Sequence, residues 1–240
     1  MEPNNQTDSC KSCGTAITGK YCSHCGQKTS TKRLSLPDIF HEVFHFFTHL
    51  EHGFFYTLKM LIISPGTMQL GYVKGDRVRH QKPFSMFFIS GTASALVYYW
   101  VNNLLIRYWH EGSTVEAEFF NKYWVLLQAA LFPFYCLIVY ICFKKARFNF
   151  GEIAVLQLYT FSVILLILGA IQLCRFLFIH LETRYVEFPI VLLYTIITNL
   201  RFFSRMNKFL VVLLSIIALV AIFGLAATVQ DNIIKLLARH

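Results

Sequence analysis

Five long runs dominated by apolar residues follow one another after residue 83. A helix needs roughly 20 residues to cross a hydrocarbon core about 30 Å thick, so each run predicts one membrane-spanning helix. The predicted spans cover residues 84–106, 123–143, 153–174, 186–203 and 209–229. The fourth is the weakest, because its apolar part covers only 188–200 and contains two threonines and an asparagine. A short tilted span and a re-entrant segment both stay open for it.

Composition points to the same class of protein. Hydrophobic residues make up 55% of the 240 residues and charged residues only 15%, which lies outside the range of soluble globular domains. The first 83 residues are more polar, and the N-terminal stretch MEPNNQTDSCKSC lacks the apolar region of a signal peptide. This part is therefore expected to stay in the reducing compartment in which it is made. The predicted fold class is an all-α membrane protein.

Basic residues are distributed in a pattern that predicts the orientation in the membrane. They cluster before the first span, after the second and after the fourth, whereas loops 107–122 and 175–185 carry glutamates beside their few basic residues. Because cytoplasmic loops are enriched in lysine and arginine, the N-terminus is expected in the cytoplasm and the C-terminus outside the inner membrane. The same rule accounts for most of the net charge of +9, so a nucleic-acid partner is not expected.

Four of the seven cysteines have the spacing of metal ligands. The pattern is C-x2-C-x8-C-x2-C, formed by Cys10, Cys13, Cys22 and Cys25. Two such pairs in a reducing compartment indicate zinc rather than disulfides, and four thiolates complete the tetrahedral shell of a structural site. So short a segment cannot build a hydrophobic core, and zinc is expected to supply its folding energy. The other three cysteines lie in apolar segments and are expected to act as small hydrophobic residues.

A second candidate metal site is the stretch HEVFHFFTHLEH. On one helix expected over residues 37–62, its four histidines fall within an arc of about 80°; they are His41, His45, His49 and His52. Two interpretations stay open, an amphipathic helix lying at the membrane interface and a second metal site. Peptide-bond hydrolysis through the HExxH pattern with Glu42 is disfavoured, because no third ligand follows at the spacing of HExxHxxGxxH.

The segment SPGTMQLGYVKGDRVRHQKPF links this helix to the first span. We expect it to be a basic loop at the level of the lipid headgroups. Its cations Arg77, Arg79 and Lys82 are expected either to anchor the protein at the inner face or to bind an anionic headgroup. The glycines do not have the spacing of a nucleotide-binding P-loop.

The cysteine knuckle, the run HEVFHFFTHLEHGFFYTLKML and the segment SPGTMQLGYVKGDRVRHQKPF together resemble an uncharacterised bacterial family of multi-pass membrane proteins, a domain of unknown function. The resemblance covers residues 10 to about 100 by motif and the rest by architecture. In that family an aspartate usually follows the first histidine, whereas this chain has Glu42. The HExxH pattern is therefore interpreted as coincidental. The resemblance implies the architecture and no activity.

The expected organisation is a zinc ribbon at 1–27, a linker at 28–36, a His-rich interfacial helix and basic loop at 37–83, a five-helix transmembrane domain at 84–229 and a C-terminal tail at 230–240. The tail either continues the fifth span or forms a short amphipathic helix. The predicted function is that of a non-catalytic membrane adaptor, sensor or scaffold, with the lipid bilayer and a cytosolic protein as partners. The alternative is a membrane-embedded metal-dependent enzyme that acts on a lipid or other apolar substrate through the histidines. A transporter ranks third, because the spans contain few ionisable residues. Homo-oligomerisation stays open.

Overall fold

The computed structural model describes residues 9–17, 19–28, 53–109, 115–177 and 183–237. Within these ranges the chain forms seven α-helices and one short 3-10 helix, and the all-α class is confirmed. The helices are α2 (Phe54–Ile63), α3 (Thr67–Lys74), α4 (Pro83–Trp109), α5 (Val115–Cys142), α6 (Phe150–Leu177), α7 (Arg184–Phe202) and α8 (Lys208–Leu237), and the 3-10 helix η1 covers Lys144–Ala146. Each predicted span falls on one of the helices α4 to α8, and only the second and fourth predicted spans extend beyond their helix, by one residue each.

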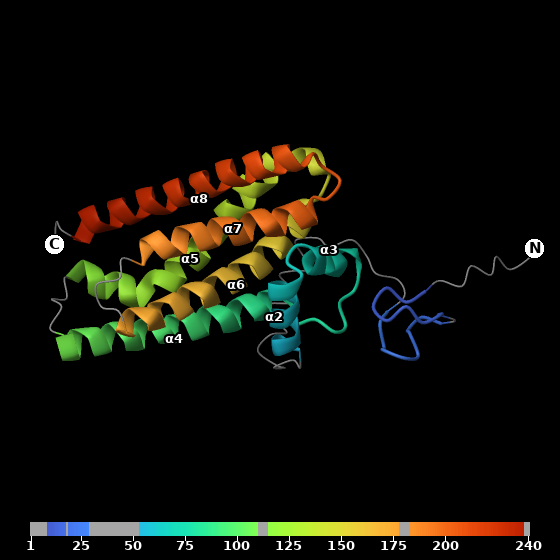
Figure 1. The fold of residues 1–240 in the computed structure, drawn as a ribbon, viewed down its shortest axis with the longest axis horizontal. Coiled ribbons are helices and arrows are strands. Elements are labelled where there is room, and N and C mark those ends of the chain that lie inside the picture. Colours follow the sequence, from blue (N-terminus) through green and yellow to red (C-terminus); the bar gives the residue numbers. More distant parts are fainter. Residues whose placement is uncertain (1–8, 18, 29–52, 110–114, 178–182, 238–240) are drawn as a thin grey trace, which may run out of the picture.

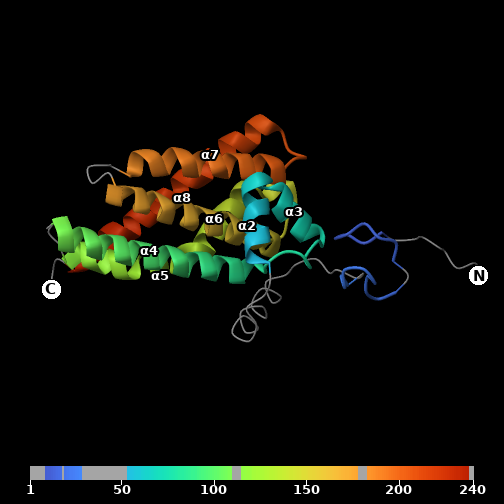
Figure 2. The same ribbon diagram turned by 60° about the horizontal axis from the view of Figure 1, so that its bottom comes forward.

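The five long helices lie side by side, and α2 crosses them at one end (Figures 1 and 2). Helix α6 is the centre of the bundle, since it packs most extensively against α4 and also contacts α5, α7, α2 and α3. Its residues from Gly151 to Thr160 are all buried. Helices α5 and α7 both pack against α8. The ribbon and the short helices α2 and α3 lie at one end of the bundle, and the chain's C-terminal helix ends at the other end (Figure 1).

Four helices in the described part of the chain are long and apolar enough to cross a membrane. They are Pro83–Leu105, Phe150–Cys174, Tyr185–Phe202 and Lys208–Leu236. The fourth predicted span is thus long enough after all. The apolar part of α5 that the structure describes is Leu126–Cys142, and the whole helix has 28 residues. Helix α8 continues without a break to Leu237, so the expected boundary between span and tail at 229 and 230 falls inside a helix.

The structure corrects two expectations about the segment before the first span. The expectation of one continuous helix over 37–62 is wrong, because Gly53 has a non-helical φ of 139° and directly precedes α2. The part before residue 53 lies outside the described residues. The end of this helix before the Ser-Pro-Gly turn is confirmed. The expected loop after the turn contains helix α3, which begins after Gly66. There the backbone amide of Gly66 donates to Gln69 Oε1 at 2.6 Å.

The corner between α2 and α3 is seated directly on α7. The hydroxyl of Tyr194 donates to the carbonyl of Leu61 at 3.3 Å, and Arg201 donates to the carbonyl of Ile63 at 3.4 Å. Gly66 has φ of 78°, and a Cβ at this position would overlap the carbonyl oxygen of Thr198 and lie 2.7 Å from the Cβ of Arg201. Only glycine fits here, because both the backbone conformation and the close approach exclude a side chain.

Candidate metal centre

The structure brings the four predicted cysteine ligands together. All four sulfur atoms lie within 4.8 Å of one another. Cys10 Sγ lies 3.5 Å from Cys25 Sγ, and Cys13 Sγ lies 3.5 Å from Cys22 Sγ. A tetrahedral zinc ion with Zn–S bonds of about 2.3 Å requires sulfurs about 3.8 Å apart. The spacing and the donor chemistry therefore fit a metal ion such as zinc.

Two nearly identical backbone turns produce this arrangement. In each turn, the amide of the first cysteine donates to the carbonyl of the residue five positions later. The carbonyl of the same cysteine accepts from the amide of the glycine four positions later. Three of these four N···O distances are 2.8 Å and the fourth is 2.9 Å. Gly14 and Gly26 have φ of 76° and 72°, a left-handed conformation that glycine adopts without cost. The two turns bring Cys10 close to Cys25 and Cys13 close to Cys22, so the sulfurs of one turn face those of the other.

The pKa values of the cysteines bear on whether the cluster can hold a cation. The hydroxyl and the backbone amide of Thr15 lower the pKa of Cys13 to about 5. Backbone hydrogen bonding to Cys13 and Ser12 lowers the pKa of Cys10 as well. For Cys25 a backbone hydrogen bond from Gln27 lowers the pKa, but burial and the three neighbouring sulfurs outweigh it and raise the pKa to about 12. Because four thiolates repel one another, complete deprotonation requires a bound cation.

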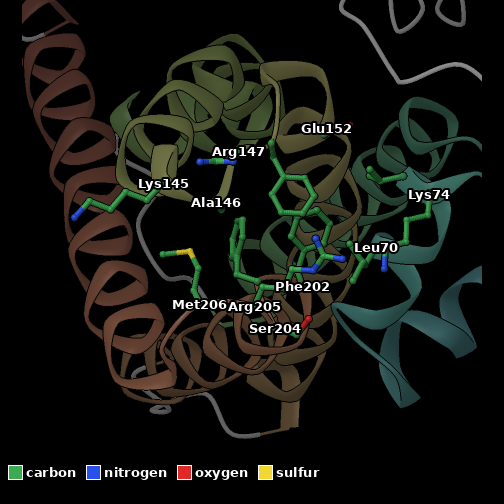
Figure 3. A pocket seen from close by; sticks show the side chains of 13 residues that line it. Leu70, Lys74, Lys145, Ala146, Arg147, Glu152, Phe202, Ser204, Arg205 and Met206 are labelled. Carbon is green, nitrogen blue, oxygen red and sulfur yellow. The ribbon is translucent and has the colours of Figure 1, made fainter.

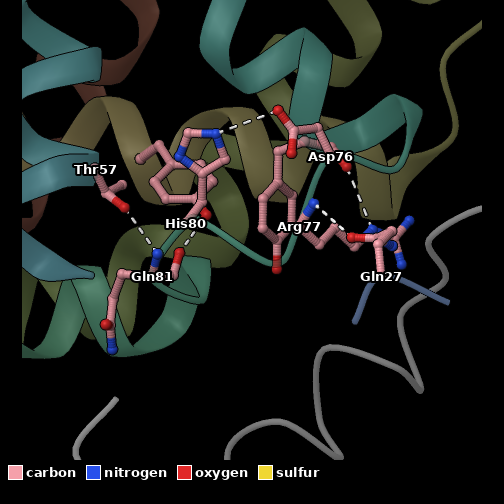
Figure 4. A network of polar contacts seen from close by, with 8 residues as sticks. Gln27, Thr57, Asp76, Arg77, His80 and Gln81 are labelled. Atoms are coloured by element: carbon pink, nitrogen blue, oxygen red, sulfur yellow. Dashed lines mark hydrogen bonds and ion pairs between the residues drawn. The ribbon is translucent and has the colours of Figure 1, made fainter. Parts of the chain in front are cut away.

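The ribbon contacts the helical bundle through the turn that follows α3 (Figure 4). The backbone amide of Arg77 donates to Gln27 Oε1 at 3.4 Å. Gln27 is the second residue after the last cysteine ligand and is 5% exposed. The side chain of Arg77 donates to the carbonyl of Tyr72 at 3.3 Å and lies over the Tyr72 ring. The same turn thus binds both the ribbon and α3.

An acidic side chain on this turn adds electrostatic contacts. Asp76 Oδ2 lies 3.7 Å from His80 Nε2. Burial alone would raise the pKa of Asp76, but interactions with His80, with the Ser12 hydroxyl of the ribbon and with Arg79 outweigh burial and leave the pKa below its usual range. Asp76 is therefore a carboxylate at neutral pH.

The far end of the turn is held by buried hydrogen bonds from two helices. Thr57 on α2 accepts from the amide of Gln81 at 2.7 Å, and Tyr159 on α6 donates to the carbonyl of Gln81 at 2.5 Å (Figure 4). Tyr159 also meets Tyr72 of α3 edge to face, with ring centroids 5.4 Å apart. The turn is thereby attached to α2, α3 and α6 at once. The ribbon rests on a fixed part of the bundle.

The other predicted site residues are placed differently. His41, His45, His49 and His52 lie outside the described residues. Among the three cations expected at lipid headgroups, Arg77 makes the contacts to Gln27 and Tyr72 given above, Arg79 is exposed and Lys82 is half-buried. Headgroup binding by these three residues stays a prediction.

A cavity inside the bundle was not foreseen from the sequence. It has a volume of about 420 Å³ and lies between α5, α6, α7 and α8. Polar side chains on its wall bond to one another: Tyr135 donates to Gln128 Oε1 at 2.9 Å, and Asn199 donates to Ser215 Oγ at 2.9 Å. The Tyr135 bond lies within α5, whereas the Asn199 bond joins α7 to α8, and hydrogen bonds of this second kind hold apolar helices together. The sequence signal was the set of glutamines, threonines and asparagines within apolar runs, which helical periodicity alone does not bring to one place.

Comparison with known proteins gives one match. A family described as "Protein of unknown function (DUF3667)" matches residues 51–94, and the chain matches no curated protein and no solved structure. The matched segment contains α2, α3, the turn that binds the ribbon and the first part of α4. The expected resemblance to a domain of unknown function is confirmed for this segment. Here, where the ribbon meets the membrane helices, the chain is similar to DUF3667.

Proposed function

We propose that the chain is a non-catalytic adaptor, sensor or scaffold of the inner membrane, whose structural zinc ribbon presents a surface to a cytosolic protein. The observation that carries this proposal is the closed set of four sulfurs. A catalytic zinc ion keeps one position open for water or substrate, whereas four thiolates fill the tetrahedral shell. The metal therefore serves to fold the ribbon, and the ribbon's contact with Arg77 holds it against the bundle.

The ribbon's surface supports a protein partner. Tyr21, which directly precedes the third cysteine ligand, is 61% exposed, and Lys11 and Lys20 are exposed as well. Tyrosine contributes large amphipathic contact area and is enriched in the residues that dominate protein interfaces. A ribbon that is fixed by its metal presents this side chain without a further ordering cost.

A photo-crosslinking amino acid placed at Tyr21 tests this function. In living cells we expect one discrete crosslinked protein at this position, and we expect it to disappear when Cys13→Ser unfolds the ribbon. The matched control position is Val220 on α8, which is 60% exposed and should face lipid. No adduct at position 21, or an adduct that persists with the ribbon unfolded, contradicts the adaptor proposal.

We further propose the topology that the charge pattern predicts, with five spans, a cytoplasmic N-terminus and an outside C-terminus. Cations from three segments far apart in the sequence line one cavity at the ribbon end of the bundle; they are Lys74, Lys145, Arg147 and Arg205. Their meeting at one end supports placing that end in the cytoplasm. The predicted second span falls on α5, whose 28 residues are enough to cross a hydrocarbon core.

Cysteine labelling in intact cells tests this topology. In a cysteine-free background, single cysteines at positions 114 and 182 are expected to react with a membrane-impermeant maleimide, because they lie in loops assigned to the outside. Cysteines at positions 78, 146 and 206 should react only after the cells are permeabilised. Labelling at 206 without permeabilisation would remove one span and place the C-terminus inside.

A further inference from the structure

A second cavity lies at the ribbon end of the bundle, and its rim is cationic. It has a volume of about 590 Å³. Lys74 comes from the last turn of α3, Lys145 and Arg147 come from η1 and its C-terminal cap, and Arg205 comes from the connection between α7 and α8. Figure 3 shows the guanidinium groups of Arg147 and Arg205 toward the middle of the view, with Lys74 beside α3 and Lys145 on the side of α8.

Cations outnumber carboxylates among the described residues that line this cavity. One carboxylate lines the cavity, that of Glu152, against four cations. Glu152 is buried and accepts a hydrogen bond from the amide of Asn149 at 2.8 Å, while its own amide donates to Asn149 Oδ1 at 2.8 Å. This reciprocal pair caps the start of α6. The positive-inside rule explains cations at this end, but it does not require three separate segments to direct them to one cavity.

The backbone at Arg147 departs from the usual conformation. Its φ of 60° makes it the one non-glycine residue with a left-handed backbone among those the structure describes. Glycine or asparagine fits such a position with less steric cost than arginine. The arginine at this C-cap therefore stands where its backbone is less favourable than that of glycine or asparagine would be.

The floor of the cavity is apolar and rigid. It is formed by Leu70, Val73, Phe148, Phe202, Phe203 and Met206. Phe148 packs on Phe202 with ring centroids 4.8 Å apart, and Phe203 stacks on Phe143 at 4.1 Å. Phe202 and Phe203 are almost fully buried. A cationic rim above an aromatic floor, at the end of membrane helices, matches a molecule with a phosphate at one end and apolar groups at the other.

We propose that this cavity binds an anionic phosphate ester, with its phosphate held by Arg147 and Arg205 and its neighbouring apolar part against the phenylalanines. Guanidinium groups suit this role because they donate two parallel hydrogen bonds to phosphate oxygens. Lys74 and Lys145 add charge at the rim. The source of the phosphate ester is either a membrane lipid such as phosphatidylglycerol or a soluble ester with an apolar group, such as phenyl phosphate. The site is separate from the ribbon, and the proposal does not depend on the adaptor function.

Native mass spectrometry of the full chain in a neutral detergent measures this binding. We expect phosphatidylglycerol to bind and phosphatidylcholine, whose headgroup is neutral overall, to bind far more weakly. Removing one cation near an anionic group should weaken phosphatidylglycerol binding about fivefold in Arg205→Gln and about 25-fold in the double variant Arg147→Gln/Arg205→Gln. Arg205→Lys keeps the charge but loses the two parallel donors, so its affinity should lie between that of the unchanged protein and that of Arg205→Gln. Arg107→Gln, an exposed arginine in the last turn of α4, is the matched control and should bind as the unchanged protein does.

Competition with a soluble ester distinguishes the two possible sources of the ligand, and three other results would overturn the proposal. If phenyl phosphate displaces phosphatidylglycerol at a comparable concentration, the ligand is a soluble ester; if it does not, the ligand is a membrane lipid. The proposal is overturned if phosphatidylglycerol and phosphatidylcholine bind equally, if the double variant keeps its affinity, or if Arg107→Gln weakens binding as much as Arg205→Gln. Retained metal and an unchanged melting temperature in each variant confirm that the protein is folded.

Discussion

Replacing Cys13 by serine is expected to release about one zinc ion per chain and to leave residues 10–25 sensitive to protease. The ribbon has no hydrophobic core, and binding of structural zinc contributes an apparent free energy of about 10–16 kcal/mol in small zinc modules. A hydroxyl in place of the Cys13 thiolate removes one of four ligands and leaves three sulfurs that repel one another. Metal analysis of the purified protein and limited proteolysis measure the two effects.

Cys174→Ser is the matched control for this experiment. Cys174 is a free cysteine in α6 and lies outside the sulfur cluster, so the same chemical change should leave the metal content unaltered. The membrane helices of the Cys13 variant should still assemble, because their packing does not involve the sulfurs. Full retention of zinc after Cys13→Ser would show that the cluster is not the metal site, and failure of membrane insertion would show that the ribbon is not a separate module.

Replacing Gly66 by alanine is expected to lower the free energy of unfolding by about 2–5 kcal/mol. A left-handed backbone costs a residue with a Cβ about 1–2 kcal/mol, and an added methyl group in a tightly packed site costs about 1–3 kcal/mol. Here the added Cβ meets backbone atoms of α7, the carbonyl of Thr198 and the amide of Phe202, which cannot move aside as a flexible side chain does. Thermal unfolding in detergent, followed by circular dichroism, measures the loss.

Gly71→Ala provides the control on the same helix. Gly71 lies inside α3, and no heavy atom lies within 4 Å of a Cβ built there. Alanine favours a helix over glycine by about 0.5–1 kcal/mol, so this variant should be as stable as the unchanged protein or slightly more stable. Equal melting temperatures for Gly66→Ala and the unchanged protein would show that the α2–α3 corner is not seated on α7 as described.

The long helices and the cysteine cluster could be predicted from the sequence, because each depends on a local pattern. Apolar runs of sufficient length determine the helices α4 to α8, and the spacing of the cysteines determines the turns that bring the sulfurs together. Helix α3 was missed for a local reason as well. Its eight residues include Gly71 and follow a Pro-Gly pair, and both features are typical of loops.

The basic cavity and the contact between the ribbon and the bundle could not be predicted in the same way. Both bring together residues that are far apart in the sequence: Gln27 meets Arg77, and Lys74 shares a cavity with Arg147 and Arg205. Charge alternation predicted that these cations lie on one side of the membrane. It contained no information on which helices are neighbours, and only the packing of α3, α6 and α7 brings them to one cavity.

Two side chains form hydrogen bonds to the backbone of Gln81, and these bonds have a mechanical consequence. A hinge requires a residue whose backbone dihedral angles can change freely, but here Thr57 holds the amide and Tyr159 holds the carbonyl, both in buried surroundings. The turn cannot bend at this residue without breaking both bonds. Bending the turn at Gln81 would break its bonds to α2 and α6, so we expect the connection between the ribbon and α4 to move together with these helices as one stiff unit.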